Sequence, residues 1–322
     1  MVAGLSLGRS ITDSLNISVY ITTFNKEKYL CEAIDSVLAQ TLQPYEIIIV
    51  DDGSQDDSRD IIQSYVNRFP ERIIPIFNEQ NLGISACRNI ALKRVIGEVV
   101  TFLDGDDIFY VDKLLSEYKI LSSQKDLSAV YSNFNYISSS GGKLGTFSEK
   151  NDQPVTGNIF NETFIRQYNV TSGNNYIYEM FYKSCAQDIG FYDEKMKIWE
   201  DWDFRIRMSK KFQYGYCPDV NSAYRKLENG LHNSELELHY SAQIKIYNKN
   251  KHLMSDLEDG DKRVIHNRIY SWLKGSWVHI IKSNLEGKKY IQLIGNIFHF
   301  IWIFQSKKAV SFLYRELFND DA

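Results

Sequence analysis

Short apolar, β-branched segments recur along the first third of the chain, and each is followed by a segment with helical spacing. The apolar segments lie at residues 17–21, 46–50, 72–77 and 99–103. Between them, apolar side chains return every three or four residues at 27–39, 61–66 and 85–95, as in amphipathic helices. Repeated strand–helix units of this length predict a parallel sheet with right-handed crossovers, covered by helices. The expected fold class is therefore α/β, with a Rossmann-like, mostly parallel sheet.

The rest of the chain is expected to be less regular and then wholly helical. The downstream regular segments are predicted at residues 112–121, 129–132, 183–189, 199–211, 214–217 and 222–225. Residues 133–175 break into Ser, Gly and Asn clusters, which predict loops and antiparallel strands. We expect a disordered lead at 1–16, an α/β domain at 17–235 and a helical C-terminal extension at 236–322.

Composition and charge exclude several classes of protein. The formal net charge is −4, and no cluster of Lys and Arg appears before the C-terminal quarter, so we expect no nucleic-acid partner. The four cysteines have neither paired nor metal-type spacing, which favours reduced thiols in a cytoplasmic protein. Residues 1–15 lack the apolar core of a signal peptide. No stretch reaches the roughly 20 apolar residues of a membrane-spanning helix.

One apolar stretch near the C-terminus leaves alternatives open. Residues 291–304 are almost wholly apolar and are flanked by lysines. Fourteen residues are too few to span a bilayer, but such a helix could lie in the membrane interface. It could equally pack against the catalytic domain or a partner subunit. We therefore expect either a peripheral contact with the inner face of the membrane or a homo-oligomer through the C-terminal helices.

Three carboxylates, Asp104, Asp106 and Asp107, follow directly on the apolar segment 99–103. Open α/β sheets bind their ligands at the carboxyl ends of strands. A corner rich in carboxylate oxygens suits Mg²⁺ or Mn²⁺ shared with a substrate phosphate. If these three carboxylates are considered alone, however, the better interpretation is an acidic turn that caps the next helix.

Five segments together resemble the family 2 glycosyltransferases. They are Val19-Tyr-Ile-Thr-Thr-Phe-Asn-Lys-Glu-Lys-Tyr-Leu30, Ile49-Val-Asp-Asp-Gly-Ser54, Asn81-Leu-Gly-Ile-Ser-Ala-Cys-Arg-Asn89, Phe102-Leu-Asp-Gly-Asp-Asp107 and Trp199-Glu-Asp-Trp-Asp203. Their order and spacing match the family over residues 17–235. The resemblance implies a GT-A-type fold and inverting transfer of a sugar from a nucleotide donor. It also implies a nucleotide-binding half at 17–132 and an acceptor-binding half at 133–235.

The resemblance assigns the donor nucleotide to polar residues at the ends of the predicted strands. Asp52 is placed to accept a hydrogen bond from a nucleobase imide such as that of uracil, with Asp51 as a weaker candidate. Arg88 either pairs with Asp104 or Asp106 or contacts the nucleotide; on its own it would read as a helix-surface arginine. Free N–H groups at the loop-to-helix junction before Arg88 favour anions. The full set of expected donor-binding residues is Thr22, Thr23, Asn25, Glu27, Asp52, Gly83, Ser85, Arg88, Asp104 and Gly105.

The metal and the catalytic base are also assigned by resemblance. Asp106 matches the position that ligates the metal directly, and Asp104 the position that meets ribose or a metal-bound water. His232 follows as a third metal candidate, although a lone loop histidine is more often merely exposed. Asp201 matches the general base, which an acceptor alcohol needs because it is a weak nucleophile at neutral pH.

Glu200 and Asp203 flank that base and are interpreted as positioning residues, with Glu200 placed in the catalytic site. Without the upstream motifs, the whole acidic cluster would read as the first turn of a helix, where carboxylates are favourable. Asp107 is expected to be structural, either behind the metal ligands or as a helix cap.

Competing functions fit the same residues less well. A dinucleotide-dependent oxidoreductase would carry a glycine-rich fingerprint after the first strand, where Thr22-Thr-Phe-Asn25 stands instead. A nucleotidyltransferase would carry a glycine-rich basic loop there, and a processive synthase would carry membrane helices. The sequence thus predicts a metal-dependent, inverting transferase that uses a UDP-sugar and Mn²⁺ or Mg²⁺ to extend a bacterial surface glycan or lipid-linked glycan. The alternative is a non-catalytic nucleotide-sugar-binding or scaffold protein of the same fold.

Overall fold

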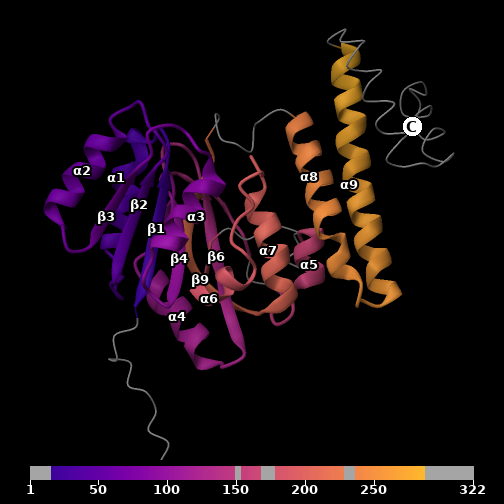
Figure 1. The fold of residues 1–322 in the computed structure, drawn as a ribbon, viewed down its shortest axis with the longest axis horizontal. Coiled ribbons are helices and arrows are strands. Elements are labelled where there is room, and N and C mark those ends of the chain that lie inside the picture. Colours follow the sequence, from indigo (N-terminus) through magenta and orange to yellow (C-terminus); the bar gives the residue numbers. More distant parts are fainter. Residues whose placement is uncertain (1–15, 149–153, 168–177, 228–235, 287–322) are drawn as a thin grey trace, which may run out of the picture. The chain divides into compact units, whose positions relative to one another are not determined.

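The structure, a computed structural model, describes residues 16–148, 154–167, 178–227 and 236–286 (Figure 1). The chain divides into two compact units, residues 1–228 and 229–322. The strands of the first unit are β1 Ile17–Thr23, β2 Glu46–Asp51, β3 Ile73–Phe77, β4 Val99–Asp104, β5 Ile108–Phe109, β6 Leu127–Ile137, β7 Lys143–Thr146, β8 Glu179–Tyr182 and β9 Gln213–Arg225. Its helices are α1 Glu27–Leu38, α2 Ser58–Arg68, α3 Ile84–Arg94, α4 Lys113–Ser123, α5 Phe160–Ile165, α6 Lys183–Asp188 and α7 Glu200–Lys211.

The described strands form one mixed sheet in the order β3-β2-β1-β4-β8-β6-β9-β5, with β7 paired to β6. Strands β1 to β4 are mutually parallel, as the strand–helix alternation predicts. Beyond β4 the pairing becomes mixed, because β8 runs antiparallel to both β4 and β6. Helix α3 packs on β1 and β2, and α4 packs on β6 and β9. The expected α/β sheet flanked by helices is confirmed.

The two central strands are buried on both faces of the sheet. Every position of β1 and β2 is buried, because helices cover the parallel part of the sheet. Such strands need apolar side chains on both faces, which explains why their sequences are continuous apolar runs rather than alternating ones. The hydrophobic core lies between these strands and the apolar faces of the helices, such as Leu30, Ile34 and Val37 of α1.

The topology creates one crevice that the site can use. From β1 the chain moves outward to β2 and β3, and then returns to place β4 on the other side of β1. Connections that leave neighbouring strands in opposite directions open a crevice at their carboxyl ends, where open α/β sheets bind ligands. The ends of β1 and β4 meet there in register, with Thr22 opposite Asp104.

Two details of the irregular region differ from the sequence prediction. Strand β6 runs to Ile137, well past the predicted end at residue 132. Residues 213–225 form one strand, β9, where two separate strands were predicted. Pro218 interrupts the apolar pattern, and the pairing with β6 skips from Cys217 to Val220, so the strand continues through a bulge.

The second unit is helical over the residues described. It contains α8 Leu236–Asn250, a 3-10 turn, η2, Lys251–Met254, and α9 Asp259–Glu286. Helices α8 and α9 pack against one another. The apolar stretch 291–304 lies outside the described residues. In the described part of the chain, none of the helices combines the length and apolar character needed to cross a membrane.

Candidate functional site

The ends of β1 and β4 carry the first part of the site. The Thr22 hydroxyl donates to Asp104 Oδ1 at 3.2 Å. Gly105 donates its N–H to the Thr22 carbonyl at 2.9 Å. A Cβ at Gly105 would lie 2.8 Å from Thr23 Oγ1, so the acidic turn can pack on β1 because residue 105 has no side chain. Thr23 is buried, and its hydroxyl has no hydrogen-bond partner in the described structure.

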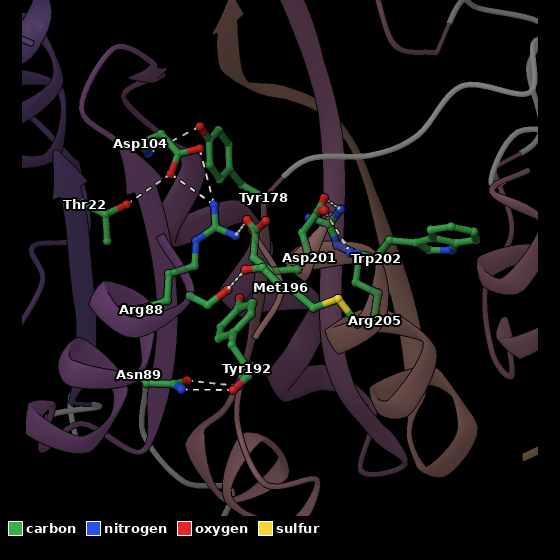
Figure 2. Close-up of polar contacts among 12 residues, drawn as sticks. Thr22, Arg88, Asn89, Asp104, Tyr178, Tyr192, Met196, Asp201, Trp202 and Arg205 are labelled. Carbon is green, nitrogen blue, oxygen red and sulfur yellow. Dashed lines mark hydrogen bonds and ion pairs between the residues drawn. The ribbon is translucent and has the colours of Figure 1, made fainter. Parts of the chain in front are cut away.

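A buried arginine joins the acidic turn to the start of α7 (Figure 2). Arg88 of α3 is only 5% exposed, which excludes a helix-surface arginine. Its Nη2 lies 3.1 Å from Asp104 Oδ1, which confirms the predicted pairing, and its Nη1 donates to Glu200 Oε1 at 2.7 Å. The guanidinium also lies 4.9 Å from the ring centroid of Phe102 and 5.4 Å from that of Tyr192. One cation therefore connects carboxylates that are far apart in the sequence.

The two carboxylates at the start of α7 have different electrostatic surroundings. Burial raises the pKa of Glu200 to about 7; Arg88 opposes this rise, and the neighbouring Asp201 adds to it. Burial also acts to raise the pKa of Asp201, but Arg205, with Arg166 and Arg88, outweighs burial and holds that pKa below its usual value. Asp201 is therefore ionised at neutral pH, as a proton acceptor must be.

The other two carboxylates of the acidic turn have separate contacts. Asp106 forms an ion pair with Lys26, whose Nζ lies 2.5 Å from Asp106 Oδ2. Asp107 is buried and accepts a hydrogen bond from the Tyr178 hydroxyl and another, at 2.6 Å, from the backbone N–H of Arg225. Asp107 thus holds the turn against β9, whereas the Asp106 side chain remains 17% exposed at the edge of the site.

Asp52, which follows β2, anchors the loop that leads into α3. Its Oδ1 accepts hydrogen bonds from Asn78 Nδ2 at 2.9 Å and Leu82 N–H at 2.8 Å, and its Oδ2 accepts from Gly83 N–H at 2.9 Å. A carboxylate offers about four acceptor positions, so three are already used by the chain. The Gly83 N–H is committed to this contact and is not free for an anion. The role of Asp52 toward a nucleobase stays a prediction.

Asp51, the weaker candidate beside it, is fully buried. Its Oδ2 accepts hydrogen bonds from Arg59 Nε at 2.8 Å and from Ser54 N–H at 3.1 Å. These contacts brace the turn after β2, and the buried Asp51 is out of reach of a donor nucleotide.

Asn25 and Glu27 tie the start of α1 to the loop after β2. Asn25 has φ +52°, a left-handed conformation that asparagine tolerates better than most residues. Its N–H donates to Ser54 Oγ at 2.9 Å, and its Oδ1 accepts from Gln55 N–H at 2.8 Å. Glu27 Oε2 accepts from Asp57 N–H at 2.9 Å. Both side chains therefore position the loops beside the crevice, and their contact with a donor stays a prediction.

Ser85 makes a contact within the chain, and its assignment to the donor stays a prediction. Ser85 is 2% exposed, and its hydroxyl donates to the Met196 carbonyl at 2.9 Å. Asn89, one turn further along α3, donates to the Tyr192 carbonyl at 3.0 Å and accepts from its N–H at 2.9 Å (Figure 2). These residues hold the loop that precedes α7, and so place Glu200 and Asp201 next to the acidic turn. Sequence analysis missed this because the contacts join distant segments.

The acidic turn has the donor atoms for a divalent cation but not a complete protein site. Asp104 and Asp106 present partly exposed carboxylates, the ligands that Mg²⁺ and Mn²⁺ favour. The Lys26 ammonium is already paired with Asp106 Oδ2. None of the described residues forms a cluster of three His, Cys, Asp or Glu side chains able to hold a metal. His232, the third predicted ligand, lies outside the described residues, and its role stays a prediction.

Several residues of this arrangement were not foreseen from the sequence. Tyr178 and Glu179 lie at the end of the irregular region, where no local pattern marks them. Lys26 lies within the first of the five motifs, but its contact with Asp106 spans 80 residues. Arg205 does have a local signal, because it stands four residues after Asp201, and residues at that spacing share one face of a helix.

Comparison with known proteins places this geometry in a family. The model of "Glycosyl transferase family 2" matches residues 18–164. An uncharacterised glycosyltransferase of Nostoc is 47% identical over 100 residues, 31% of each chain. One from Methanocaldococcus jannaschii is 31% identical over 212 residues, 65% of this chain and 70% of that one. A minor teichoic acid biosynthesis protein of Bacillus subtilis is 30% identical over 227 residues, 65% of this chain and 47% of that one.

The match thus covers about a third of the Nostoc protein, and it covers 19% of each of two Rickettsia relatives.

Solved structures agree on the fold. The structure of S. aureus TarS 1–349 with UDP-GlcNAc has a TM-score of 0.60 at 19% identity, covering 83% of this chain and 81% of that one. The mannosyltransferase PcManGT of Pyrobaculum calidifontis, with GDP-Man and Mn²⁺, has a TM-score of 0.58 at 14% identity, covering 95% and 88%. The chain belongs to glycosyl transferase family 2.

Proposed function

We propose that the protein is a metal-dependent, inverting glycosyltransferase that moves a sugar from a nucleoside-diphosphate donor to a hydroxyl of a glycan acceptor. The observation that supports this most directly is the link through Arg88. Arg88 binds Asp104, at the end of β4, and also binds Glu200, at the start of α7, which lies 112 residues further along the chain than Arg88. This contact brings a corner suited to a metal and a diphosphate next to a second acidic pair, in the crevice where α/β sheets bind ligands.

The proposed reaction is a single displacement. The acceptor hydroxyl oxygen attacks the anomeric carbon of the donor sugar, a new C–O bond forms, and the bond to the diphosphate breaks with inversion. Asp201 takes the hydroxyl proton, which it can do because its carboxylate is ionised and 38% exposed. Glu200 is held by Arg88 and keeps the start of α7 beside the turn. The nucleoside diphosphate is the leaving group.

Asp106 and Asp104 are the residues that would hold Mn²⁺ or Mg²⁺. A cation bound there supplies Lewis-acid stabilisation of the charge that develops on the diphosphate. To bind one, Asp106 must give up or share its contact with Lys26. Mn²⁺ and GDP-Man are present in the Pyrobaculum structure, and UDP-GlcNAc in the TarS structure, which supports a nucleotide-sugar donor with a metal. We favour a UDP-sugar because an aspartate beside β2, Asp52, retains one acceptor position that an imide N–H could use.

The acceptor is proposed to be a surface glycan or lipid-linked glycan of a bacterium, extended on the cytoplasmic side. The relative named for minor teichoic acid biosynthesis supports this choice of polymer. A contact of the C-terminal helices with the membrane or with a second subunit is part of the same proposal. It rests on the sequence of residues 291–304 alone.

A donor screen on the purified full chain tests the proposal. UDP-, GDP- and dTDP-sugars are each mixed with the protein and Mg²⁺ or Mn²⁺, and donor hydrolysis and thermal stabilisation are measured. A selective donor should raise the unfolding temperature and be hydrolysed slowly, because ligands that bind only the folded state stabilise it. The Asp201→Asn variant should bind that donor as tightly as the wild type but release no sugar.

Two results would count against the proposal. Stabilisation by a donor with no turnover in the wild type would support the alternative, a non-catalytic sugar-nucleotide-binding protein. Turnover by Asp201→Asn at a rate near that of the wild type would remove Asp201 as the base.

A further inference from the structure

The carboxylate of Asp201 is held by two donors that lie on the same helix. Arg205 Nη1 donates to Asp201 Oδ2 at 2.8 Å, and the backbone N–H of Trp202 donates to Asp201 Oδ1 at 2.8 Å (Figure 2). Each oxygen therefore has one fixed partner. Because a carboxylate oxygen has two lone pairs, each can accept one further hydrogen bond. The Asp201 side chain is 38% exposed, so an acceptor hydroxyl can reach it.

Arg205 itself is held from the opposite side by a buried carboxylate. Arg205 Nη2 and Nε donate to Glu179 Oε2 at 2.9 Å and 3.1 Å. Glu179, in β8, is fully buried, and Arg205 is only 4% exposed. The forked guanidinium thus has one edge on the sheet and one nitrogen on Asp201, a geometry that the single ammonium of lysine cannot reproduce.

We propose that Arg205 is a positioning residue for the transfer reaction: anchored by Glu179, it fixes the orientation of the Asp201 carboxylate and keeps it ionised for the acceptor hydroxyl. This inference rests on the proposed function, in which Asp201 is the base. No recognised motif position assigns this role to Arg205 or Glu179. Their arrangement connects the last helix of the site to a strand at the middle of the sheet.

A second ion pair on the same helix shows what is particular about this one. Arg207 Nη2 lies 2.8 Å from Asp203 Oδ2, also four residues apart. Asp203 is fully buried, so no acceptor can reach its carboxylate. Of these two pairs, only the one that includes Asp201 has a carboxylate that an acceptor in the crevice can reach.

The charge on Asp201 depends on groups from several elements. The Arg205 guanidinium is the strongest of those that favour the charged form. If Arg205 is removed, burial still favours the neutral form of Asp201, and only more distant arginines oppose that effect. The charged and titratable groups that act on or are affected by Asp201 are Arg205 and Glu200 of α7, Arg166 after α5, Arg88 of α3, Glu179 of β8 and Tyr224 of β9.

The test variant is the double substitution Arg205→Met/Glu179→Gln. Arg205→Met alone would leave Glu179 as a buried, unpaired carboxylate, which commonly destabilises a fold. The glutamine removes that charge and keeps the side-chain shape, so the fold should survive while Asp201 loses its cation. Glu179→Gln alone retains Arg205. The control is Lys211→Met, which removes one cation from the same helix where it pairs with the exposed Asp188.

The rate of sugar transfer is measured from pH 3.5 to pH 9, over the range in which the variants stay folded, with saturating donor and metal. We expect the double variant to lose at least tenfold in kcat at pH 7, with the donor KM within twofold. Because the pKa of Asp201 rises when Arg205 is removed, the rate should begin to fall at a higher pH than in Lys211→Met. Arg205→Lys should regain part of the rate, since it keeps the charge. Glu179→Gln should still fall in rate at the wild-type pH, because Arg205 remains beside Asp201, but its kcat should be lower, because Arg205 loses its anchor.

The proposal is wrong if the double variant shows the pH profile and kcat of Lys211→Met. It is also wrong if Arg205→Lys and the double variant have identical rates and profiles, because the cation would then have no effect on the base. If the proposed function itself is wrong, different measurements show it: the wild type transfers no sugar, or Asp201→Asn transfers sugar at the full rate.

Discussion

Replacing Arg88 with methionine is the most informative test of how the site is held together. The guanidinium lies between Glu200, at 2.7 Å, and Asp104, at 3.1 Å, and it is almost completely buried. Removing one partner of a buried ion pair commonly costs about 3–5 kcal/mol, since an uncompensated charge remains. The Glu200 side chain is 9% exposed and the Asp104 side chain 32%, so most of the penalty should come from Glu200.

The penalty should also depend on pH. Burial raises the pKa of Glu200 from 4.5 to about 7 while Arg88 opposes the rise, so removing Arg88 moves it higher still. An acid with a raised pKa in the folded state loses stability as the pH rises from its unfolded to its folded value. One pKa unit corresponds to about 1.4 kcal/mol, so Arg88→Met should be at least about 1 kcal/mol less stable, relative to the wild type, at pH 8 than at pH 6.

Urea unfolding followed by circular dichroism at both pH values measures this directly. The matched variant is Arg88→Met/Glu200→Gln, in which the buried charge is gone and much of the lost stability should return. A destabilisation below about 1 kcal/mol, equal at pH 6 and pH 8 and unchanged by Glu200→Gln, would refute the reasoning, because buried pairs that matter cost several times that amount.

Two further substitutions test the acidic turn. Gly105→Ala should reduce stability by about 1–3 kcal/mol in urea unfolding, because its Cβ would lie 2.8 Å from Thr23 Oγ1 and force the turn off β1. Gly145→Ala, with no atom within 4 Å of the added carbon, is the control and should change stability little. Asp106→Ala should weaken nucleotide binding in the presence of Mn²⁺ at least tenfold by calorimetry, whereas removal of the exposed Asp126 should not. An unchanged affinity for Asp106→Ala would exclude it as a metal ligand.

Much of the fold was readable from the chain because its strands are buried on both faces. Continuous apolar runs indicate strands of a helix-covered sheet, and β1 to β4 are found where those runs stand, although β3 lies at the edge and is only partly buried. The spacing of apolar residues placed α1, α3 and α7 to within two residues at each end. The prediction failed in the mixed part of the sheet. There β6 and β9 pair along long, irregular strands, and a bulge at Pro218 hides one continuous strand behind two apolar pieces.

The site was only partly predictable, because its contacts join segments that are far apart in the sequence. Motifs located the polar residues at strand ends, and the pairing of Arg88 with Asp104 was one of the alternatives they left. The contacts within the motifs were less clear, because nothing in the sequence shows that the Ser85 hydroxyl donates to the Met196 carbonyl. The partner of that hydroxyl was open until the fold placed the carbonyl beside it.

The sequence by itself determined the α/β class, the family and the strand ends where the acidic residues gather, since these depend on local periodicity and on motif order. Only the tertiary structure decided which charges meet. Arg88 reaches Glu200 over 112 residues, and Glu179 reaches Arg205 over 26. A buried charge needs an opposite charge or a hydrogen-bond partner close by, but the sequence around the charged residue does not show where along the chain that partner lies. That choice was made by the packing of α3 and α7 against the sheet, which sets Asp201 beside the acidic turn.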